Sequence, residues 1–464
     1  MIASRPRMLC IAYQFPPVGG AGVQRVAKFA KFLPQHGWDV SVLTVSNPST
    51  PLSDESLTAD IPPETVVCRA RTWEPHYAVK SSLSAADSGR SAFARVAGRS
   101  KAFAKRVAAS ILQPDPQILW LPAAFSAGRR LLATRRHSVI FASGPPFSSF
   151  LLAARLAQVS RLPLVLDYRD EWTISNRYWE NKGNGRWTQW VSRQLQTQVL
   201  RQADLVLATT DESREALAEE VQRARSSAVT ACIPNGYDPD DLNAGDLPTG
   251  SGDERSAEAS PGFSANDRPY RIAHIGTLWR LTTVAPLLAA MERLAERNPR
   301  AAARLQLEFL GRCTPPEQAL LDRLSSHCPR LVLQGYAPHQ DAVRMMHAAD
   351  ELCVLLADVP EAARVMPAKT FEYLATGRPI LAIAPPGAMR RTLSQHSGVA
   401  EFSPSDVSGI CEHLERCSSV GQRPAPHVRD LSALDRCVQA GRLARHFEQL
   451  TTAASHAPAS TRLA

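Results

Sequence analysis

The sequence predicts two α/β domains of the doubly wound, Rossmann-like kind, each a parallel sheet covered by helices on both faces. Three observations predict this fold class. Short apolar runs alternate with helical stretches in the first half of the chain, the alternation restarts in the second half, and a polar segment separates the halves. The 464 residues are enough for two or three domains.

In the first half, five apolar runs are typical of strands. They are Met8–Tyr13, Asp39–Val45, Ser138–Ser143, Pro163–Asp170 and Asp204–Thr210. Three segments between them have the composition of helices: Gly22–Gly37, Phe147–Leu162 and Trp187–Ala203. A glycine at the end of the first of these is the residue that commonly terminates a helix. Strand and helix therefore alternate as a parallel sheet requires.

The second half repeats this alternation. Its strand candidates are Arg271–Leu278, Leu305–Arg312, Leu331–Tyr336, Asp350–Ala357 and Pro379–Ala384. Helices are expected at Val284–Asn298, at Gln318–Cys328 and from Pro367 onward. The pattern indicates a second doubly wound domain.

The segment Asn243–Pro269 is rich in Gly, Ser, Pro and acidic residues and is expected to be a disordered insert. We therefore expect a first domain at 1–230, a hinge with the insert at 231–270 and a second domain at 271–425. Residues 426–464 are expected to form a helix that returns toward the first domain and ends in a disordered tail.

The composition is that of an ordinary globular protein, with 44% hydrophobic and 21% charged residues. The net charge of +9 suits nucleic acid, an anionic membrane surface or phosphorylated substrates, and does not choose between them. The nine cysteines have no C-x-x-C spacing, which favours buried free thiols over disulfides or zinc. The N-terminus reads as a first strand and not as a signal peptide. No apolar run reaches 18 residues, so no membrane-spanning segment is expected.

The stretch "PAKTFEYLATGRPILAI" reads as a helix running into a strand, with Lys369 and Glu372 three positions apart in the first turns. A solvated ion pair worth a few tenths of a kcal/mol is one interpretation. In the other, the lysine and the backbone amides face a phosphate and the carboxylate faces hydroxyl groups. The stretch alone does not decide between them.

The loop "PPVGGAGVQR" follows the first strand and opens the first helix. Gly19, Gly20 and Gly22 would let backbone amides approach a phosphate, although a flexible turn has the same composition. The loop lacks the spacing of a dinucleotide fingerprint, and the second strand is not followed by an acidic residue. The sequence thus argues against NAD binding.

Other candidates lie at strand ends, where ligands of open α/β sheets bind. "VLDYRDEWT" places Asp167, Arg169 and Asp170 together, and "FASGPPFSS" places Gly144 before two prolines. "HIGTLWRL" contributes Gly276, Thr277 and Arg280, and "LQGYAP" contributes Gly335 and Tyr336. Each candidate also has a purely structural interpretation: the loops as turns, Arg280 as a surface residue and Tyr336 as a core residue. His274 is expected to be a packed strand histidine.

Six motifs in order resemble a known family: "YQFPPVGGAGVQRVAKFAKFLPQHGWDVSVLT", "SGPPFSSFLLAARL", "LDYRDEWT", "IPNGYD", "HIGTL" and "PAKTFEYLATGRPILA". Together they are similar to a group 1 (family 4-like) glycosyltransferase of the GT-B fold. The resemblance extends over about Arg7–Leu450 apart from the insert. It implies two Rossmann-like domains facing across a cleft, with the acceptor held by the first and a nucleotide-sugar by the second.

The resemblance assigns expected roles. Glu372 matches the family's second glutamate, which holds the ribose hydroxyls, and Lys369 with the amides after Pro367 would lie against the diphosphate. Arg364 stands where the family has its first glutamate, and Glu361 is out of register, so the hexose contact departs from the family pattern. Thr277 replaces a basic residue, and Arg280 and Lys369 are candidates to supply its charge.

The expected site residues form three sets. The catalytic set is Asp170, Arg280 and Lys369. The donor-binding set is Gly19, Gly20, Gly22, Gly276, Thr277, Gly335, Tyr336, Pro367, Ala368 and Glu372. The acceptor-binding set is Asp167, Arg169 and Gly144. No metal is expected, and no cofactor beyond a UDP- or GDP-linked sugar as co-substrate.

The resemblance implies a retaining, metal-independent hexosyltransferase that acts on a glycan or lipid-linked acceptor in cell-surface polysaccharide synthesis. Two alternatives remain open: a nucleotide-sugar epimerase of the same fold, and a non-catalytic GT-B binding subunit. The expected location is cytoplasmic, and no nucleic acid is expected as a partner. Ser91–Leu112 reads as a helix with an apolar stripe and a basic flank, which predicts either peripheral contact with an anionic membrane or packing on the first domain.

Overall fold

The computed structural model describes residues 5–50, 52–75, 112–178, 185–243, 268–420 and 422–456. The chain divides into two compact units, one formed by residues up to Pro234 together with the segment from Arg436, and the other by Asn235–Asp435. The expected boundaries were residues 230 and 425. The predicted basic helix at 91–112, nearly all of the insert and the end of the C-terminal tail lie outside the described residues.

The first unit is built on a seven-stranded sheet in the order β3-β2-β1-β4-β5-β6-β7, in which all neighbouring strands are parallel. Its strands are β1 Arg7–Ile11, β2 Asp39–Val45, β3 Val66–Ala70, β4 Val139–Gly144, β5 Leu164–Tyr168, β6 Leu205–Ala208 and β7 Val229–Cys232. Its helices are α1 Ala21–Phe32, α4 Leu121–Thr134, α5 Ser148–Ser160, α6 Trp172–Tyr178, α7 Arg186–Leu200, α8 Asp211–Arg223 and α18 Arg436–His456. Short 3-10 helices are η1 Leu33–His36, η2 Glu55–Thr58 and η4 Pro116–Trp120.

The second unit has a six-stranded parallel sheet in the order β10-β9-β8-β11-β12-β13. Its strands are β8 Tyr270–Ile275, β9 Leu305–Leu310, β10 Leu331–Gln334, β11 Glu351–Leu355, β12 Ile380–Ile383 and β13 Val399–Phe402. Its helices are α9 Pro239–Asn243, α11 Ala285–Arg297, α12 Pro299–Ala303, α13 Pro315–Ser325, α14 His339–Ala348, α15 Lys369–Ala375, α16 Ala388–Leu393 and α17 Val407–Ser418. Within its described residues the second unit also has the 3-10 helices η7 Pro360–Arg364 and η8 Ser432–Leu434.

Both sheets are buried on both faces because their central strands are mostly apolar, with buried side chains on both sides of the strand. In β1, Leu9 and Ile11 belong to one buried cluster, and Met8 and Cys10 belong to another on the opposite face. The same alternation in β8 divides the core of the second unit into two clusters. Each sheet therefore has the layered α/β architecture that the sequence predicted.

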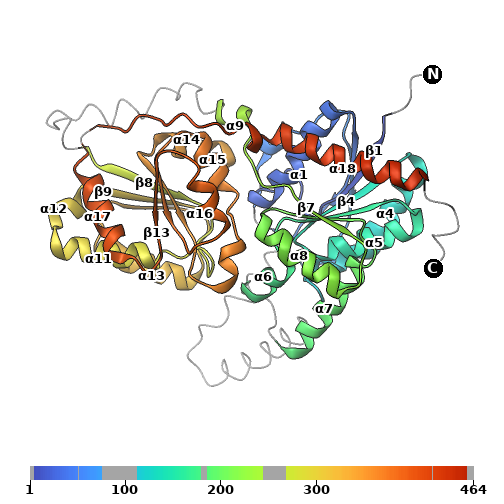
Figure 1. Cartoon of the computed structure of the whole chain (residues 1–464), viewed down its shortest axis with the longest axis horizontal. Helices are drawn as coiled ribbons and strands as arrows, with labels where there is room; N and C mark the ends of the chain where they lie inside the picture. Colours follow the sequence, from blue (N-terminus) through green and yellow to red (C-terminus); the bar gives the residue numbers. More distant parts are fainter. Residues whose placement is uncertain are drawn as a thin grey trace. The chain divides into compact units, whose positions relative to one another are not determined.

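The C-terminal helix α18 packs on the first unit beside α1 (Figure 1). Its Phe447 is fully buried, and the Phe447 ring lies 5.1 Å from the ring of Trp38. The chain thus returns to its first domain after completing the second.

In each sheet the chain first adds strands on one side of the first strand and then on the other. The change of side, or topological switch point, lies between β1 and β4 in the first sheet and between β8 and β11 in the second. In open α/β sheets, ligands bind beyond the carboxyl ends of the strands at such switch points. The fold therefore points to the loops after β1 and β4 in the first unit, and after β8 and β11 in the second.

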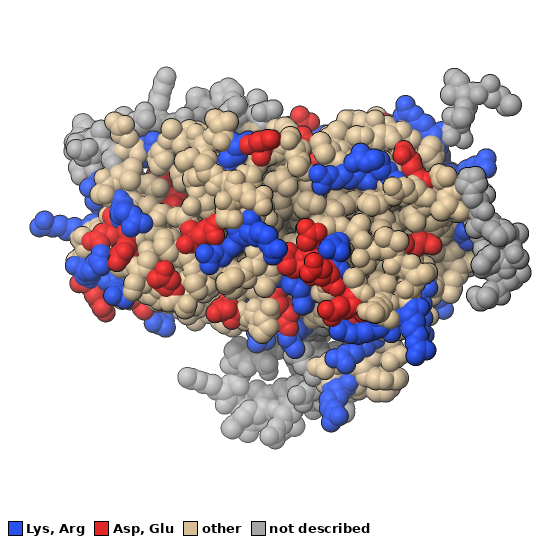
Figure 2. Space-filling model, viewed as in Figure 1, with Lys and Arg blue, Asp and Glu red and all other residues tan. Residues whose placement is uncertain are grey.

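The surface is of mixed charge on the side in view. Figure 2 shows basic and acidic side chains side by side there, so the excess of positive charge is not gathered in one patch of that face. On α8, for example, Arg223 is paired with Glu219 and Glu220. Among the helices that the structure describes, none has the length and apolarity needed to cross a membrane.

Candidate functional site

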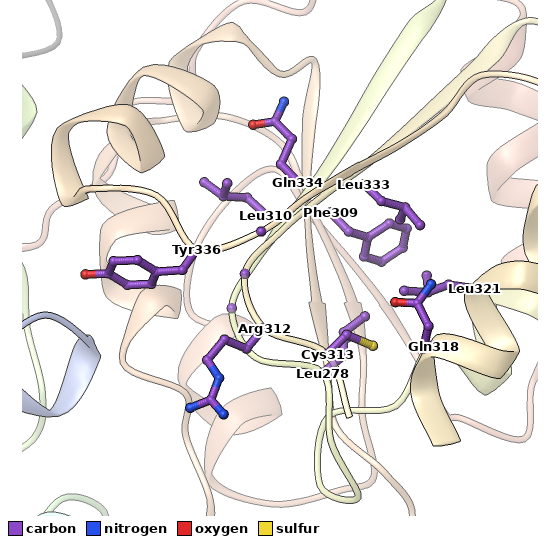
Figure 3. Close-up of a pocket in the computed structure, with 13 residues that line it drawn as sticks. Leu278, Phe309, Leu310, Arg312, Cys313, Gln318, Leu321, Leu333, Gln334 and Tyr336 are labelled. Carbon is purple, nitrogen blue, oxygen red and sulfur yellow. The ribbon is translucent and has the colours of Figure 1, made fainter. Parts of the chain in front are cut away.

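A pocket of about 340 Å³ lies in the second unit at the carboxyl ends of β8, β9 and β10 (Figure 3). Each of these three strands is followed directly by a glycine, and all three glycines line the pocket: Gly276, Gly311 and Gly335. Phe309, Leu321 and Leu333 lie together on one side, and Arg312 and Tyr336 extend on the other. An apolar wall with a few polar groups is typical of a small-molecule site.

Close packing explains why position 311 is a glycine, but it does not explain the glycine at position 335. A Cβ added to Gly311 would lie 2.2 Å from the carbonyl oxygen of Gly276, so the loops after β8 and β9 touch only because that side chain is absent. A Cβ added to Gly335 would meet no atom within 4 Å. Because neither packing nor a positive φ requires glycine at position 335, open space beside the backbone is what this residue provides.

Three of the site residues that the sequence predicts in or next to this pocket, Thr277, Arg280 and Tyr336, are exposed. Thr277 is exposed directly after Gly276, and Arg280 is at the tip of a tight turn closed by two hydrogen bonds between Trp279 and Thr282. The amide of Gly276 donates to the carbonyl of Leu310 at 2.9 Å, so it is already used within the sheet. Tyr336 is 37% exposed.

Lys369 and Glu372 form an ion pair, as one of the two interpretations of the sequence predicted, with Nζ 2.8 Å from Oε2. The pair is not solvated, because Glu372 is only 8% exposed and Lys369 16%. His339 joins it, with Nδ1 3.2 Å from the Lys369 Nζ and Nε2 3.3 Å from a carboxylate oxygen of Asp241. Four ionisable side chains from α9, α14 and α15 therefore meet in one cluster, where the sequence indicated two.

The cluster is attached to the end of β8. The hydroxyl of Tyr373, the residue after Glu372, accepts a hydrogen bond from the amide of Ile275 at 2.7 Å. Pro367 and Ala368 precede α15, and their carbonyls accept from Thr370 and Phe371. Pro367 has no N–H to offer a phosphate, so only the amides after it could do so. Arg364 ends η7, the 3-10 helix that follows β11.

In the first unit, Arg169 ties two candidate loops together. Its Nη1 donates to the carbonyl of Gly22 and its Nη2 to the carbonyl of Pro145, each at 2.5 Å. A Cβ on Gly22 would come within 2.9 Å of the guanidinium carbon, so a glycine is needed for this approach. Gly20, at φ +114°, precedes α1, and the Gly19 amide donates to the carbonyl of Leu52. The glycine loop is held in place by these contacts.

Asp167 is fully buried and paired with Arg25, which is also fully buried. The Arg25 guanidinium reaches both carboxylate oxygens at 2.8–3.1 Å, and the Ser143 hydroxyl donates to the same carboxylate at 2.7 Å. This geometry favours a structural role for Asp167, and its part in holding an acceptor stays a prediction. The sequence reasoning missed Arg25. A charged residue among the buried positions of α1 was the available signal.

Gly144 and Asp170 differ in exposure at the same sheet edge. Gly144 ends β4 and is buried, and a Cβ there would come within 2.9 Å of the Phe150 ring. Asp170 is 59% exposed and lies 3.9 Å from the Arg169 guanidinium. Asp170 is therefore the carboxylate of the "DYRD" segment that a ligand could reach. Its catalytic role stays a prediction.

Of the residues that line the pocket, Gly276, Gly335 and Tyr336 were expected, and Gly311 and Arg312 are among those that were not. Their signal was present, because three successive strands of the second half end in "HIG", "FLG" and "LQG". His339 and Asp241 had no such signal, since they meet Lys369 only in the folded chain. His274 is buried, and its Nδ1 lies 2.9 Å from the carbonyl of Cys353, as expected for a packed histidine.

The sequence profile of the glycosyl transferase 4-like domain matches residues 19–236, which is nearly all of the first unit except β1 and α18. A comparison with curated proteins finds no match for the sequence. The profile match and the motif order agree on the same family.

Solved structures share the fold over almost the whole chain. A sucrose-phosphate synthase from Thermosynechococcus elongatus is 16% identical, with a TM-score of 0.59, covering 97% of this chain and 98% of that chain. The Anabaena protein HepE in complex with UDP-glucose is 13% identical, with a TM-score of 0.52 and coverage of 97% and 100%. A putative UDP-N-acetylglucosamine 2-epimerase from Listeria monocytogenes is 12% identical, with a TM-score of 0.50 and coverage of 96% and 97%. The resemblance to glycosyltransferases of the GT-B fold is confirmed.

Proposed function

We propose that this chain, a GT-B protein whose residues 19–236 match the glycosyl transferase 4-like domain, is a retaining glycosyltransferase. It moves a hexose from a nucleotide-sugar to a glycan or lipid-linked acceptor, without a metal ion, in cell-surface polysaccharide synthesis. The observation that carries the proposal is the pocket of about 340 Å³ at the ends of β8, β9 and β10, beside the charged cluster around Lys369.

The pocket has the features that a nucleotide requires. Its apolar side, with Phe309 and Leu333, suits the faces of a base, and Gln334 can hydrogen-bond a base edge. The open space beside Gly335 lets the ligand approach the backbone. The complex of HepE with UDP-glucose, which has the same fold, supports a UDP-linked donor.

The Lys369 cluster supplies charge for the rest of the donor. Ribose hydroxyls that donate to Glu372 would replace part of its bond to Lys369, which frees the ammonium group to approach the diphosphate. Arg280 and Arg312 add exposed guanidinium groups on neighbouring strand ends. Negative charge grows on the diphosphate as the glycosidic bond to it breaks, and cations placed beforehand stabilise that charge.

The acceptor side is proposed to lie in the first unit, at the edge where Arg169 joins the loops after β1 and β4. Asp170 is the exposed carboxylate there. Attachment to an anionic membrane surface would bring a lipid-linked acceptor to this edge. Sedimentation with anionic vesicles at low and high salt tests that attachment, and absence of binding at low salt would remove it.

The experiment that tests the function measures donor binding and turnover by the purified full-length protein. A thermal-shift series with UDP- and GDP-sugars identifies the donor, because a ligand at 100 times its Kd stabilises the folded state by about 2.7 kcal/mol. Turnover of that donor is then followed with and without a glycan acceptor. A transferase needs acceptor for full release of the nucleotide.

An epimerase is the second candidate, since one of the proteins with this fold is a putative UDP-N-acetylglucosamine 2-epimerase. It would change the sugar without any acceptor. A chain that neither binds nor turns over any nucleotide-sugar would be a non-catalytic binding subunit, and the proposal would then be wrong.

A further inference from the structure

A second cluster of reactive side chains lies in the second unit at the amino-terminal ends of the strands, opposite the pocket. Glu351 is the first residue of β11, whereas the pocket lies beyond the carboxyl ends of the strands. His413 and Cys417, four residues apart on one face of α17, both reach its carboxylate. None of the three belongs to the proposed donor or acceptor sites.

The three ligating atoms form a nearly equilateral triangle. His413 Nε2 lies 3.1 Å from Glu351 Oε2 and 3.5 Å from Cys417 Sγ, and that sulfur lies 3.6 Å from the same carboxylate oxygen. Atoms bound to one tetrahedral Zn²⁺ at ~2.0–2.3 Å are ~3.3–3.8 Å apart. The two distances to the sulfur lie within this range, and the nitrogen-to-oxygen distance is ~0.2 Å below its lower end, a difference that a small side-chain shift removes.

The cluster is sheltered from water. Glu351 is 3% exposed and His413 12%, and Cys417 is buried. Tyr270, at the start of β8, is a polar neighbour of Cys417. Polar neighbours of this kind can orient metal ligands.

Charge distinguishes a metal site from a simple hydrogen-bonded pair. Without a metal, the buried Glu351 carboxylate has only an imidazole and a thiol as side-chain partners among the hydrogen bonds of this cluster. A divalent ion removes the thiol proton, because coordination deprotonates a thiol outright. The ion, one thiolate, one carboxylate and a neutral imidazole then sum to zero charge, so no net charge is buried.

We propose that Glu351, His413 and Cys417 bind a structural Zn²⁺ ion, with a water molecule in the fourth position. A carboxylate, an imidazole and a thiolate are all zinc ligands. The ion links α17 to the amino-terminal end of β11. The ion would stabilise the packing of α17 on the sheet of the second unit, and it takes no part in glycosyl transfer.

The test uses the full-length protein without an affinity tag. The protein is treated with chelator, dialysed against Zn²⁺, desalted and analysed by inductively coupled plasma mass spectrometry. We expect one zinc ion to remain per chain. Cys417→Ser should weaken binding more than ~100-fold, the upper end of what outer-contact changes cost. Cys328→Ser is the matched control, because Cys328 is also buried in this domain and its thiol donates to the backbone carbonyl of Leu305, away from the proposed ligands.

Cobalt substitution gives a readout that needs no variant. Co²⁺ bound to a thiolate has a sulfur-to-metal charge-transfer band in the near ultraviolet, which we expect in the unaltered protein and in Cys328→Ser. The proposal is overturned if the unaltered protein retains no zinc, if the cobalt complex lacks that band, or if folded Cys417→Ser retains as much metal as Cys328→Ser.

Discussion

Replacing Glu372 tests whether the Lys369 cluster binds the donor or is only an ion pair. The carboxylate is 8% exposed and accepts from Lys369 at 2.8 Å. Glu372→Ala leaves the lysine with His339 as its remaining close partner, at 3.2 Å. Loss of one partner of a buried hydrogen bond costs ~1–3 kcal/mol, so the free energy of unfolding should fall by that amount.

Donor affinity should fall separately. Two ribose hydroxyls left unpaired in the site cost ~1–3 kcal/mol, which corresponds to a Kd raised about 10- to 100-fold. Isothermal titration with the donor identified by thermal shift measures it. The control is Glu415→Ala, which removes a partly exposed carboxylate from Arg297 and Asn298 in the same domain. That variant should lose stability and keep its donor affinity.

A nucleotide analogue without the two ribose hydroxyls sharpens the test. Unaltered protein and Glu372→Ala should bind this analogue equally, because the contact that the variant removes is already missing. Equal affinity of both proteins for the intact nucleotide, together with normal turnover, would refute the reasoning and return Lys369 and Glu372 to a structural ion pair.

Three further predictions concern catalysis, the pocket and pH. Arg280→Ala should lower kcat more than donor affinity, since the leaving diphosphate carries more charge in the transition state; a change in KM alone would make Arg280 a plain binding residue. Gly335→Val should abolish donor binding with little change in Tm, whereas Gly311→Ala should lower the Tm because its Cβ would meet a backbone oxygen at 2.2 Å; equal melting temperatures would contradict this. Burial lowers the pKa of His274 from 6.5 to about 4. Between these two pH values, His274 is protonated in the unfolded chain and neutral in the folded chain, so a falling pH favours unfolding. Stability should therefore drop by ~3 kcal/mol between pH 6.5 and 4, and denaturant titrations should show a shallower drop for His274→Leu.

The central strands could be predicted from the sequence because they are continuous runs of mostly apolar residues. The edge strands β3, β7 and β13 were not recognised. Their segments "VVCRA", "VTAC" and "VAEF" are short and only partly buried, since an edge strand has a neighbour on one side alone. Local sequence carries little signal for a strand whose burial depends on the rest of the sheet.

The same division applies to the candidate site. The glycines that end β8, β9 and β10, and the Lys-x-x-Glu spacing, are local features that the sequence displays by itself. The close approach of Gly311 to Gly276 is decided by strand order, because β9 pairs with β8 along its length. The sequence therefore indicated where the chain turns, and the sheet register decided which turns share a pocket.

The sequence by itself determined the α/β alternation, the two-domain organisation and the resemblance to a glycosyltransferase family, because these depend on local patterns and on motif order. Only the tertiary structure decided which charged groups meet. Arg25 pairs with Asp167 across 142 positions, and His413 meets Glu351 across 62. Such contacts depend on how the strands are ordered and how the helices pack on them, and propensities of neighbouring residues contain no information about partners so far away along the chain.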